Sequence, residues 1–183
     1  MNTSAPRFPD QFQTRRLVLR APCASDARRL FDAYTRDPEV ARFMVWRPHE
    51  ALAETEAFIA GCSHAWGAGV RWPYVLALRE DVQQPIGMLE VRVRSHTIDL
   101  GYVLARGHWG QGLMPEALGA VTDAVLAMPQ FFRVQATCDI ENNASARALE
   151  KSGFLLEARL ERYVLHPNIS PEPRACLMYA LCR

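Results

Sequence analysis

The sequence predicts an α/β protein with one mixed sheet and helices on both of its faces. The first observation is the order of periodic segments, which runs strand, helices, three strands, helix, strand, helix and two strands. The second is the length of 183 residues, which fits a single domain, residues 1–183, and is too short for two separate cores. The third is a composition of 49% hydrophobic and 22% charged residues, which excludes disordered and collagenous classes.

The first half of the chain contains the early helices and four of the expected strands. Alternating apolar and charged residues predict a strand at residues 14–21, behind residues 1–13, which we expect to be a flexible segment. Apolar residues at helical spacing predict a helix over residues 25–35, and Pro38 begins a short one. A longer helix is expected over residues 50–66. Strands are then expected at 72–78, 86–94 and 98–104, with a polar turn at 80–85.

The second half alternates helices and strands. An apolar stripe of Leu118, Val121, Val125 and Met128 predicts a helix over residues 115–128. The elements expected after it are a strand at 131–140, a helix at 142–152, and strands at 154–164 and 174–181. The last strand carries Leu177, Tyr179 and Leu181, which could belong to the core or form the edge of a homodimer.

Charge and cysteine usage narrow the class of partner. Lys and Arg number 21 against 20 Asp and Glu, so the net charge of +1 attracts neither nucleic acid nor an anionic membrane. No apolar run has signal-peptide or membrane-span length, which predicts a cytoplasmic protein. The five cysteines are widely spaced and include no CxxC pair, so we expect reduced thiols and no metal site.

A glycine-rich loop between a strand and a helix is the strongest sign of a binding site. The strand at 98–104 leads into residues 105–112, where Gly110 and Gly112 leave room for a phosphate at the start of the next helix. The loop lacks the G-K-[ST] of a Walker A motif, and its glycine spacing is the reverse of the dinucleotide fingerprint. A plain glycine turn is the alternative.

Two motifs in this region resemble the GNAT (GCN5-related N-acetyltransferase) family, in particular its Rim-type branch, which acetylates the N-termini of ribosomal proteins. The run from Gly107 to Gly112 (GHWGQG) occupies the positions of the family's acetyl-CoA loop, after the segment DLGYVL that starts at Asp99. Farther along, ENNAS at Glu141–Ser145 and LEKSGF at Leu149–Phe154 are similar to a second motif of that branch. The resemblance implies a mostly antiparallel sheet of about six to seven strands.

The resemblance also implies acetyl-CoA as the co-substrate, with the pantetheine lying along the strand that ends at Leu104. The implied cofactor contacts are Tyr102, Val103, Leu104, Gly110, Gln111, Gly112, Leu113, Met114, Asn142 and Arg147. Arg106 is the alternative to Arg147 for the 3′-phosphate. Two departures stand out: Gly107 replaces the usual Gln or Arg, and Pro115 has no N–H to donate.

Acetyl transfer requires a deprotonated amine, stabilisation of the oxyanion, and a proton for the leaving thiolate. Ser145 matches the residue that gives this proton in the family, which transfers the acetyl group directly, without an acyl-enzyme. Helix capping is the alternative role for both Asn142 and Ser145. A backbone N–H near Val103 is the expected oxyanion donor. Trp46 is the expected wall of an acceptor pocket, with a place in the hydrophobic core as the alternative, and residues 166–173 are expected to form a second part of the acceptor cleft.

The general base is ranked among three carboxylates: Asp99 first, then Glu90 and Glu161, with a water relay as the alternative. A turn centred on His96 pairs Glu90 with Tyr102, which predicts that Glu90 and Asp99 lie on opposite faces of the sheet.

The predicted activity is an acetyl-CoA-dependent N-acetyltransferase whose acceptor is a protein N-terminal amine or a small-molecule amine. The competing hypothesis is a non-catalytic acyl-CoA-binding module, motivated by Gly107, Pro115 and the lack of an obvious base. A nucleotide-dependent oxidoreductase ranks third because the glycine spacing is reversed.

Overall fold

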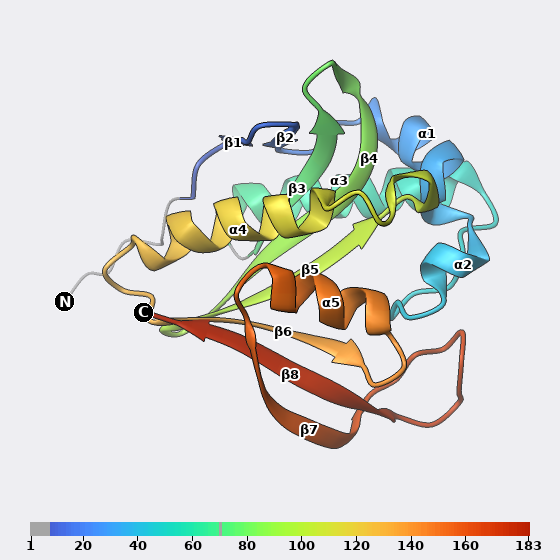
Figure 1. The fold of residues 1–183 in the computed structure, drawn as a ribbon. Coiled ribbons are helices and arrows are strands. Elements are labelled where there is room, and N and C mark those ends of the chain that lie inside the picture. Colours follow the sequence, from blue (N-terminus) through green and yellow to red (C-terminus); the bar gives the residue numbers. More distant parts are fainter. Residues whose placement is uncertain (1–7, 70) are drawn as a thin grey trace.

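The structure is a computed structural model that describes residues 8–69 and 71–183, and it confirms a mixed sheet with helices on both faces (Figure 1). Within these residues eight strands form one sheet in the order β1-β2-β3-β4-β5-β6-β8-β7. The strands are β1 (Gln11–Gln13), β2 (Leu17–Arg20), β3 (Arg71–Leu78), β4 (Asp81–Arg94), β5 (Thr97–Leu104), β6 (Arg133–Asp139), β7 (Leu155–Val164) and β8 (Arg174–Cys182).

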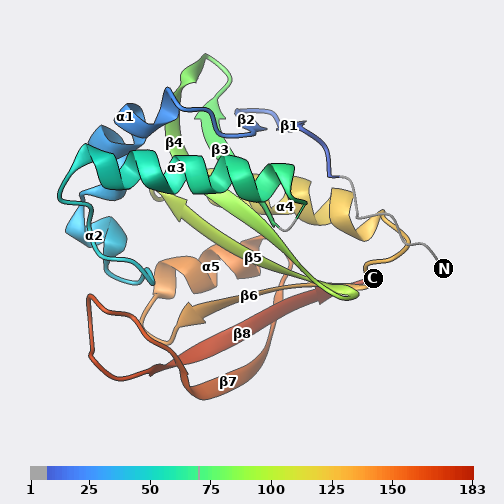
Figure 2. The same cartoon turned by 180° about the vertical axis from the view of Figure 1, so that it is seen from behind.

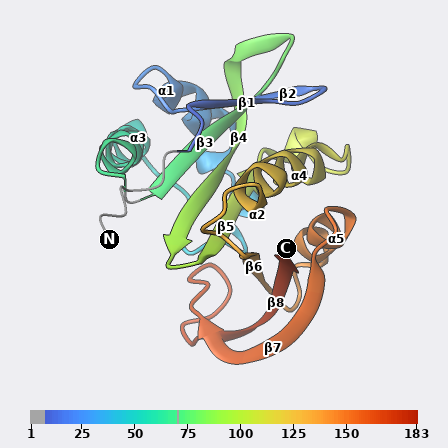
Figure 3. The same ribbon diagram turned by 90° about the vertical axis from the view of Figure 1, so that its left-hand side faces the viewer.

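Helices cover the two faces in separate groups. The helices are α1 (Asp26–Leu30), the π-helical turn η1 (Phe31–Thr35), α2 (Pro38–Ala41), α3 (Leu52–Gly67), the 3₁₀ turn η2 (Arg106–His108), α4 (Leu113–Leu126) and α5 (Asn143–Lys151). The view from behind shows α3 in front of the sheet that α4 covers on the other side (Figure 2). A quarter turn shows α4 and α5 together on one side of the sheet and α3 on the other (Figure 3). Each group of helices therefore buries its own hydrophobic cluster.

The two halves of the sheet meet at its one parallel pair, β5 with β6. Pairing covers Thr97 to Asp99 of β5 and stops there, although β5 continues to Leu104 and β6 to Asp139. Beyond Asp99 the two strands diverge toward their carboxyl ends (Figure 1). This divergence leaves the backbone of the second half of β5 without a neighbouring strand on the β6 side, and we call the opening the wedge.

The hairpin between β4 and β5 corrects the predicted register. Arg94 pairs with Thr97, so the turn consists of two residues, Ser95 and His96, with Ser95 at φ 60°. As a result Glu90 pairs with Gly101 and Asp99 pairs with Arg92. The prediction that the two carboxylates lie on opposite faces was wrong, because a shift of one residue in a hairpin moves a side chain to the other face.

The N-terminal segment adds a strand to the expected sheet. Residues 11–13, expected to be flexible, form β1 beside β2, and residues 1–7 lie outside the described residues. Order follows from burial, because Phe8 and Phe12 are only 2% and 8% exposed and the Tyr74 hydroxyl donates to the Pro9 carbonyl at 2.6 Å. The polar segment 80–85 also differs from expectation, since β4 already begins at Asp81.

The C-terminal strand lies inside the sheet. β8 pairs with β6 on one side and β7 on the other, and Leu177, Tyr179 and Leu181 pack into the core beneath α5. Their alternative placement at a dimer edge was wrong, because β7 is the edge strand. Cys62, Cys138 and Cys176 are buried free thiols, while Cys23 and Cys182 are free and exposed. None of the helices in residues 8–69 and 71–183 is long and apolar enough to cross a membrane.

Candidate active site

A pocket of about 540 Å³ occupies the wedge, and we call it the wedge pocket. Its walls are the end of β5, the loop to α4, the first turns of α4 and α5, and α2 with the segment that follows it. Of the residues proposed from the sequence, those that line it are Tyr102, Val103, Leu104, Gly110, Gly112, Leu113, Met114, Asn142, Ser145 and Arg147. The two motifs, about 40 residues apart in the chain, thus meet at one cavity.

The glycine loop ends in a helix N-terminus that faces the pocket. Gly112 is the N-cap of α4 with φ 73°, and Gly110 has φ 75°, a left-handed conformation that side chains other than glycine rarely adopt. The first N–H groups of a helix have no partner within it, so those of Leu113 and Met114 remain available for an anion. Pro115 occupies the third position of α4, where a missing N–H breaks no intrahelical hydrogen bond.

A part-buried ion pair fixes this loop to the start of β2. The Glu116 carboxylate accepts hydrogen bonds from the Thr14 hydroxyl (2.6 Å), the Arg16 N–H (2.7 Å) and the Arg16 Nε (2.7 Å). A second nitrogen of Arg16 donates to the Gln111 carbonyl at 2.9 Å. Burial raises the pKa of Glu116, but these hydrogen bonds outweigh it and hold the pKa below its usual value. The sequence analysis missed this pair, because about 100 residues separate its partners.

The free edge of β5 can accept an extended ligand. Ala105 N–H donates to the Ile86 carbonyl at 2.8 Å, which directs the peptide groups of alternate residues toward β4. The peptide groups of Tyr102 and Leu104 therefore point into the wedge. The Leu104 carbonyl already accepts from the Trp109 indole at 2.7 Å. The N–H groups of Tyr102 and Leu104 remain available to a ligand in the wedge, whereas the Val103 N–H points to β4.

Two hydroxyl groups meet across the wedge. The Tyr102 hydroxyl on β5 lies 2.6 Å from the Ser145 Oγ on α5, within hydrogen-bond distance. Asn142 is the N-cap of α5 and accepts from the Ser145 N–H at 3.1 Å, so its capping role is observed. Ser145 is thus held by its backbone and by its side chain at the wall of the pocket.

The surroundings of this pair favour neutral groups. Burial raises the pKa of Tyr102 above its usual range, with the hydrogen bond to Ser145 acting in the opposite direction. Burial likewise raises the pKa of the nearby Cys138 thiol to about 11. Cys138 is therefore a protonated thiol at neutral pH and a poor nucleophile.

The candidate bases lie in different places. Asp99 is on the far face of the sheet, where it accepts from Gln135 at 2.7 Å and pairs with Arg94 at 3.3 Å. Glu90 shares that face and pairs with Arg71 at 2.9 Å. Of these carboxylates none lines the wedge pocket. The carboxylate that does is Glu39, which the sequence analysis did not single out.

The other site residues proposed from the sequence lie in different surroundings. Glu161 is an exposed residue of β7 paired with Arg159 at 2.6 Å. Arg106 pairs with Asp37 at 3.2 Å, whereas Arg147 lines the wedge pocket. Gln111 contributes its backbone, and its side chain donates to the Gly107 carbonyl at 3.0 Å.

Trp46, expected in an acceptor pocket, packs instead against the core cluster beneath α1 and α3. Its carbonyl accepts from Asn168 in the β7–β8 loop at 2.7 Å. That hydrogen bond joins the two segments expected to form the acceptor cleft.

The splayed sheet, the free strand edge and the helix N-terminus form a site that suits an extended ligand carrying phosphate groups. Comparisons with known proteins define the class as an acetyltransferase. An acetyltransferase (GNAT) domain model matches residues 16–155. The uncharacterized N-acetyltransferase YoaA of Bacillus subtilis (strain 168) is 26% identical over 161 residues, which is 87% of this chain and 90% of YoaA.

Solved structures show the same fold. RimJ of Mycobacterium smegmatis, in complex with CoA-disulfide, superposes with a TM-score of 0.80 at 21% identity, over 94% of this chain and 86% of RimJ. The microcin C7 self-immunity acetyltransferase MccE, in complex with acetyl-CoA and AMP, gives a TM-score of 0.84 at 16% identity, over 96% and 98%.

The family model covers most of the chain, so the chain belongs to the GNAT acetyltransferase family. It is an acetyl-CoA-dependent N-acetyltransferase.

Proposed function

We propose that this enzyme transfers the acetyl group directly to an amine bound in the wedge pocket, with Ser145 as the proton donor to the leaving thiolate. The observation that carries the proposal is the 2.6 Å contact between the Tyr102 hydroxyl and the Ser145 Oγ. When the tyrosine donates this hydrogen bond, the proton of Ser145 is left free to point into the pocket. Acetyl-CoA supplies the activated thioester.

The backbone groups along the wedge support the rest of the reaction. The N–H groups of Tyr102 and Leu104 are available to an extended ligand and to the negative charge that develops on the carbonyl oxygen. The N-terminal turn of α4 offers its N–H groups to a pyrophosphate, and Arg147 offers a cation to a further phosphate. Cys138 stays protonated, which supports direct transfer without an acyl-enzyme.

The amine acceptor in this proposal is a protein N-terminus or a small-molecule amine. Glu39 is the carboxylate of the pocket wall and the candidate base alongside a water relay, while Asp99 stays a prediction that the pocket geometry does not favour. Because none of the five cysteines forms a disulfide, the proposal places the enzyme in the reducing cytoplasm.

The test is Ser145→Ala, with Ser63→Ala on α3 as the matched control. Ser63 also sits in a helix, where its hydroxyl donates to the Ile59 carbonyl at 3.2 Å, but it does not line the pocket. We expect Ser145→Ala to lower kcat by roughly 10 to 100-fold, at or below the lower end of the range for general acids, since a thiolate is a good leaving group. Calorimetry should show unchanged acetyl-CoA binding. Acetyl-CoA binding without turnover of any amine by the wild type would instead support the non-catalytic module.

A further inference from the structure

The short helix α2 and the residues after it form a wall of the wedge pocket that lies outside both family motifs. Glu39 and Val40 of α2 line the pocket, together with residues 42–44. We call residues 37–46 the α2 segment. The helix has only four residues, and a helix of this length is not stable on its own in water. The position of Glu39 therefore depends on contacts between the α2 segment and the rest of the protein.

The start of the α2 segment is held by the residues that follow β5. The Asp37 carboxylate caps α2 by accepting a hydrogen bond from the Glu39 N–H at 2.9 Å. Its other oxygen lies 3.2 Å from the Arg106 Nε, and Arg106 begins η2, two residues after the end of β5. One carboxylate thus connects the backbone of Glu39 to the β5 side of the wedge.

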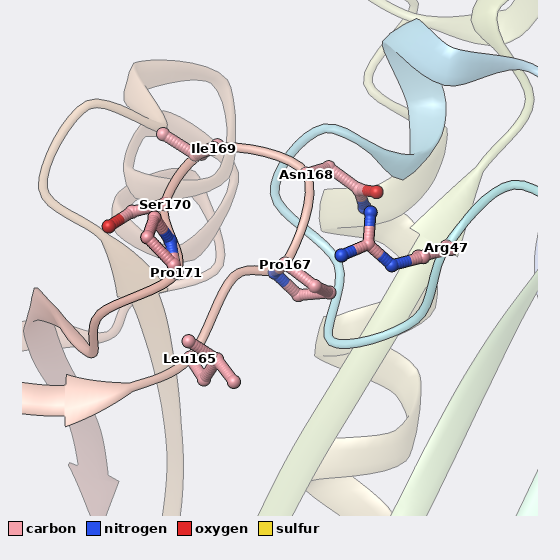
Figure 4. Close-up of a pocket in the computed structure, with 7 residues that line it drawn as sticks. All are labelled: Arg47, Leu165, Pro167, Asn168, Ile169, Ser170 and Pro171. Atoms are coloured by element: carbon pink, nitrogen blue, oxygen red, sulfur yellow. The ribbon is translucent and has the colours of Figure 1, made fainter.

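The end of the α2 segment is held by Asn168 of the β7–β8 loop. The amide nitrogen of Asn168 donates to the carbonyls of Ala41 at 2.6 Å and Trp46 at 2.7 Å, so both hydrogens of one NH₂ group are used. Ala41 is the last residue of α2, where a backbone carbonyl has no partner within the helix. Figure 4 shows Asn168 facing the segment that carries Arg47. Asn168 therefore supplies hydrogen bonds that the short helix cannot make for itself.

The β7–β8 loop is in turn anchored to the second half of the sheet. The N–H groups of Ile169 and Ser170 donate to the His166 carbonyl at 2.9 and 3.1 Å, which closes the turn that carries Asn168. The buried His166 ring lies 3.8 Å from the Asp139 carboxylate at the end of β6. Since β6 is the strand that diverges from β5, the α2 segment spans the wedge from one side to the other (Figure 2).

Glu39 lies between these two attachment points. Among the described residues its carboxylate makes no hydrogen bond or ion pair, so it is free to accept a proton, whereas the Asp37 carboxylate is engaged on both oxygens. A general base must lie within hydrogen-bond reach of the proton that it removes, and a displacement of about 1 Å can lower a rate by about a hundredfold. Contacts that fix α2 therefore also fix the reach of Glu39.

We infer that Asn168 and Arg106 are positioning residues of the reaction, which act through α2 to hold the Glu39 carboxylate beside the acceptor amine. Asn168 has the larger effect, because it makes two part-buried hydrogen bonds, whereas Arg106 in its pair with Asp37 is largely exposed. The inference rests on the proposed function, in which Glu39 is the candidate base. The attachment of α2 by Asn168 can also be measured without turnover.

The experiment combines Asn168→Asp, which removes both donors at nearly constant size, with Glu39→Gln. The matched control is Gln130→Glu, the same change of amide to carboxylate at an exposed position that does not line the wedge pocket. The kcat/KM is measured by mass spectrometry at saturating acetyl-CoA, with the best acceptor among tripeptides with a free N-terminus and polyamines. Hydrogen exchange of residues 37–46 reports the attachment of α2, and calorimetry reports acetyl-CoA binding.

We expect Asn168→Asp to lower kcat/KM for the acceptor by about tenfold with an unchanged Kd for acetyl-CoA, and to have no further effect in Glu39→Gln. Arg106→Gln should lower kcat/KM by about two- to threefold. Hydrogen exchange of residues 37–46 should be faster in Asn168→Asp and unchanged in Gln130→Glu. If Asn168→Asp does not fold, Asn168→Ala, which adds no charge, provides the same comparison.

The outcomes separate the inference from the proposed function. Full activity in Asn168→Asp, or a loss that adds fully to that of Glu39→Gln, overturns the inference and leaves acetyl transfer through Ser145 intact. Unchanged hydrogen exchange in Asn168→Asp overturns the inference as well. Absence of turnover of any amine by the wild type, with faster exchange in Asn168→Asp, overturns the proposed function and leaves the attachment of α2 by Asn168 intact.

Discussion

At the scale of single residues, the pocket depends on side chains that hold one another in position. Ser145 is fixed by Asn142 through its backbone and by Tyr102 through its hydroxyl. The capping and catalytic roles considered for Asn142 and Ser145 are therefore compatible, because a cap that fixes the first turn of α5 also fixes the serine. The motif located these residues, whereas the tyrosine contact required the fold.

The base can be assigned by comparing two conservative substitutions. Glu39 lines the wedge pocket, whereas Asp99 is engaged by Gln135 on the far face of the sheet. We expect Glu39→Gln to lower kcat/KM by at least about tenfold, because it removes the group that would accept the proton of the amine. Asp99→Asn should change kcat/KM by less than about twofold. A large loss in Asp99→Asn with normal Glu39→Gln activity would return the role to Asp99.

At the scale of elements, Arg16, which precedes β2, holds the glycine loop and α4 in position. Arg16 binds both the Glu116 carboxylate and the Gln111 carbonyl. Arg16→Ala should weaken acetyl-CoA binding by about three to tenfold in calorimetry, the loss of a part-buried ion pair, with kcat nearly unchanged. Arg28→Ala is the control, since the pair of Arg28 with Asp32 is exposed. We call the contacts of Arg16 with Glu116 and Gln111 the clamp. An unchanged Kd for acetyl-CoA in Arg16→Ala would show that the loop keeps its conformation without the clamp.

The same clamp has a defined dependence on pH. The folded-state pKa of Glu116 is below its usual value of 4.5, so its contribution is complete above that value. It is lost as the pH falls through the depressed pKa of the folded state. Above pH 5 the clamp therefore contributes no pH dependence to acetyl-CoA binding.

The elements most accurately predicted are those whose pattern repeats within the element. The apolar stripe predicted α4 to within two residues at each end, and both glycine-loop and α5 motifs fell on the elements expected. The register of β4 with β5 was predicted one residue out, because it depends on whether the turn contains two or three residues. β1 was missed because three residues carry too little pattern, and only their contacts with β2 and the core define them.

At the scale of the whole molecule, the second half of the sheet depends on a buried charge. The Asp139 side chain at the end of β6 is fully buried and receives hydrogen bonds from Arg174 at 2.6 and 3.1 Å. Burial raises the pKa of Asp139, but the arginine and the Glu141 N–H outweigh it and lower the pKa. Sequence patterns cannot reveal such a pair, because β6 and β8 meet only in the folded sheet.

Removing the partner of this carboxylate should destabilise the fold. We expect Arg174→Gln to lower the free energy of unfolding by about 3 kcal/mol, because it leaves a buried charge unpaired. Arg159→Gln, which breaks an exposed pair on β7, should cost less than about 1 kcal/mol. Urea denaturation at pH 7 measures both. Folding lowers the pKa of Asp139 from its usual value of 3.8. The stabilising effect of the charged carboxylate is therefore present above pH 3.8 and is lost as the pH falls through the folded-state pKa. Equal losses in the two variants would contradict this view of Asp139.

The wedge is the feature that connects the whole fold to its chemistry. Three segments distant in sequence line it, residues 39–44, 102–115 and 142–151, and none of them forms a pocket alone. The central claim is that Tyr102 and Ser145 act as one unit across this opening.

The most direct test is a double-mutant cycle of Tyr102→Phe and Ser145→Ala, read as kcat at saturating acetyl-CoA and acceptor. If the tyrosine acts by orienting the serine hydroxyl, Tyr102→Phe lowers kcat by about tenfold in the wild type and has no further effect in Ser145→Ala. Additive losses in the double variant, or full activity in Tyr102→Phe, would contradict the account.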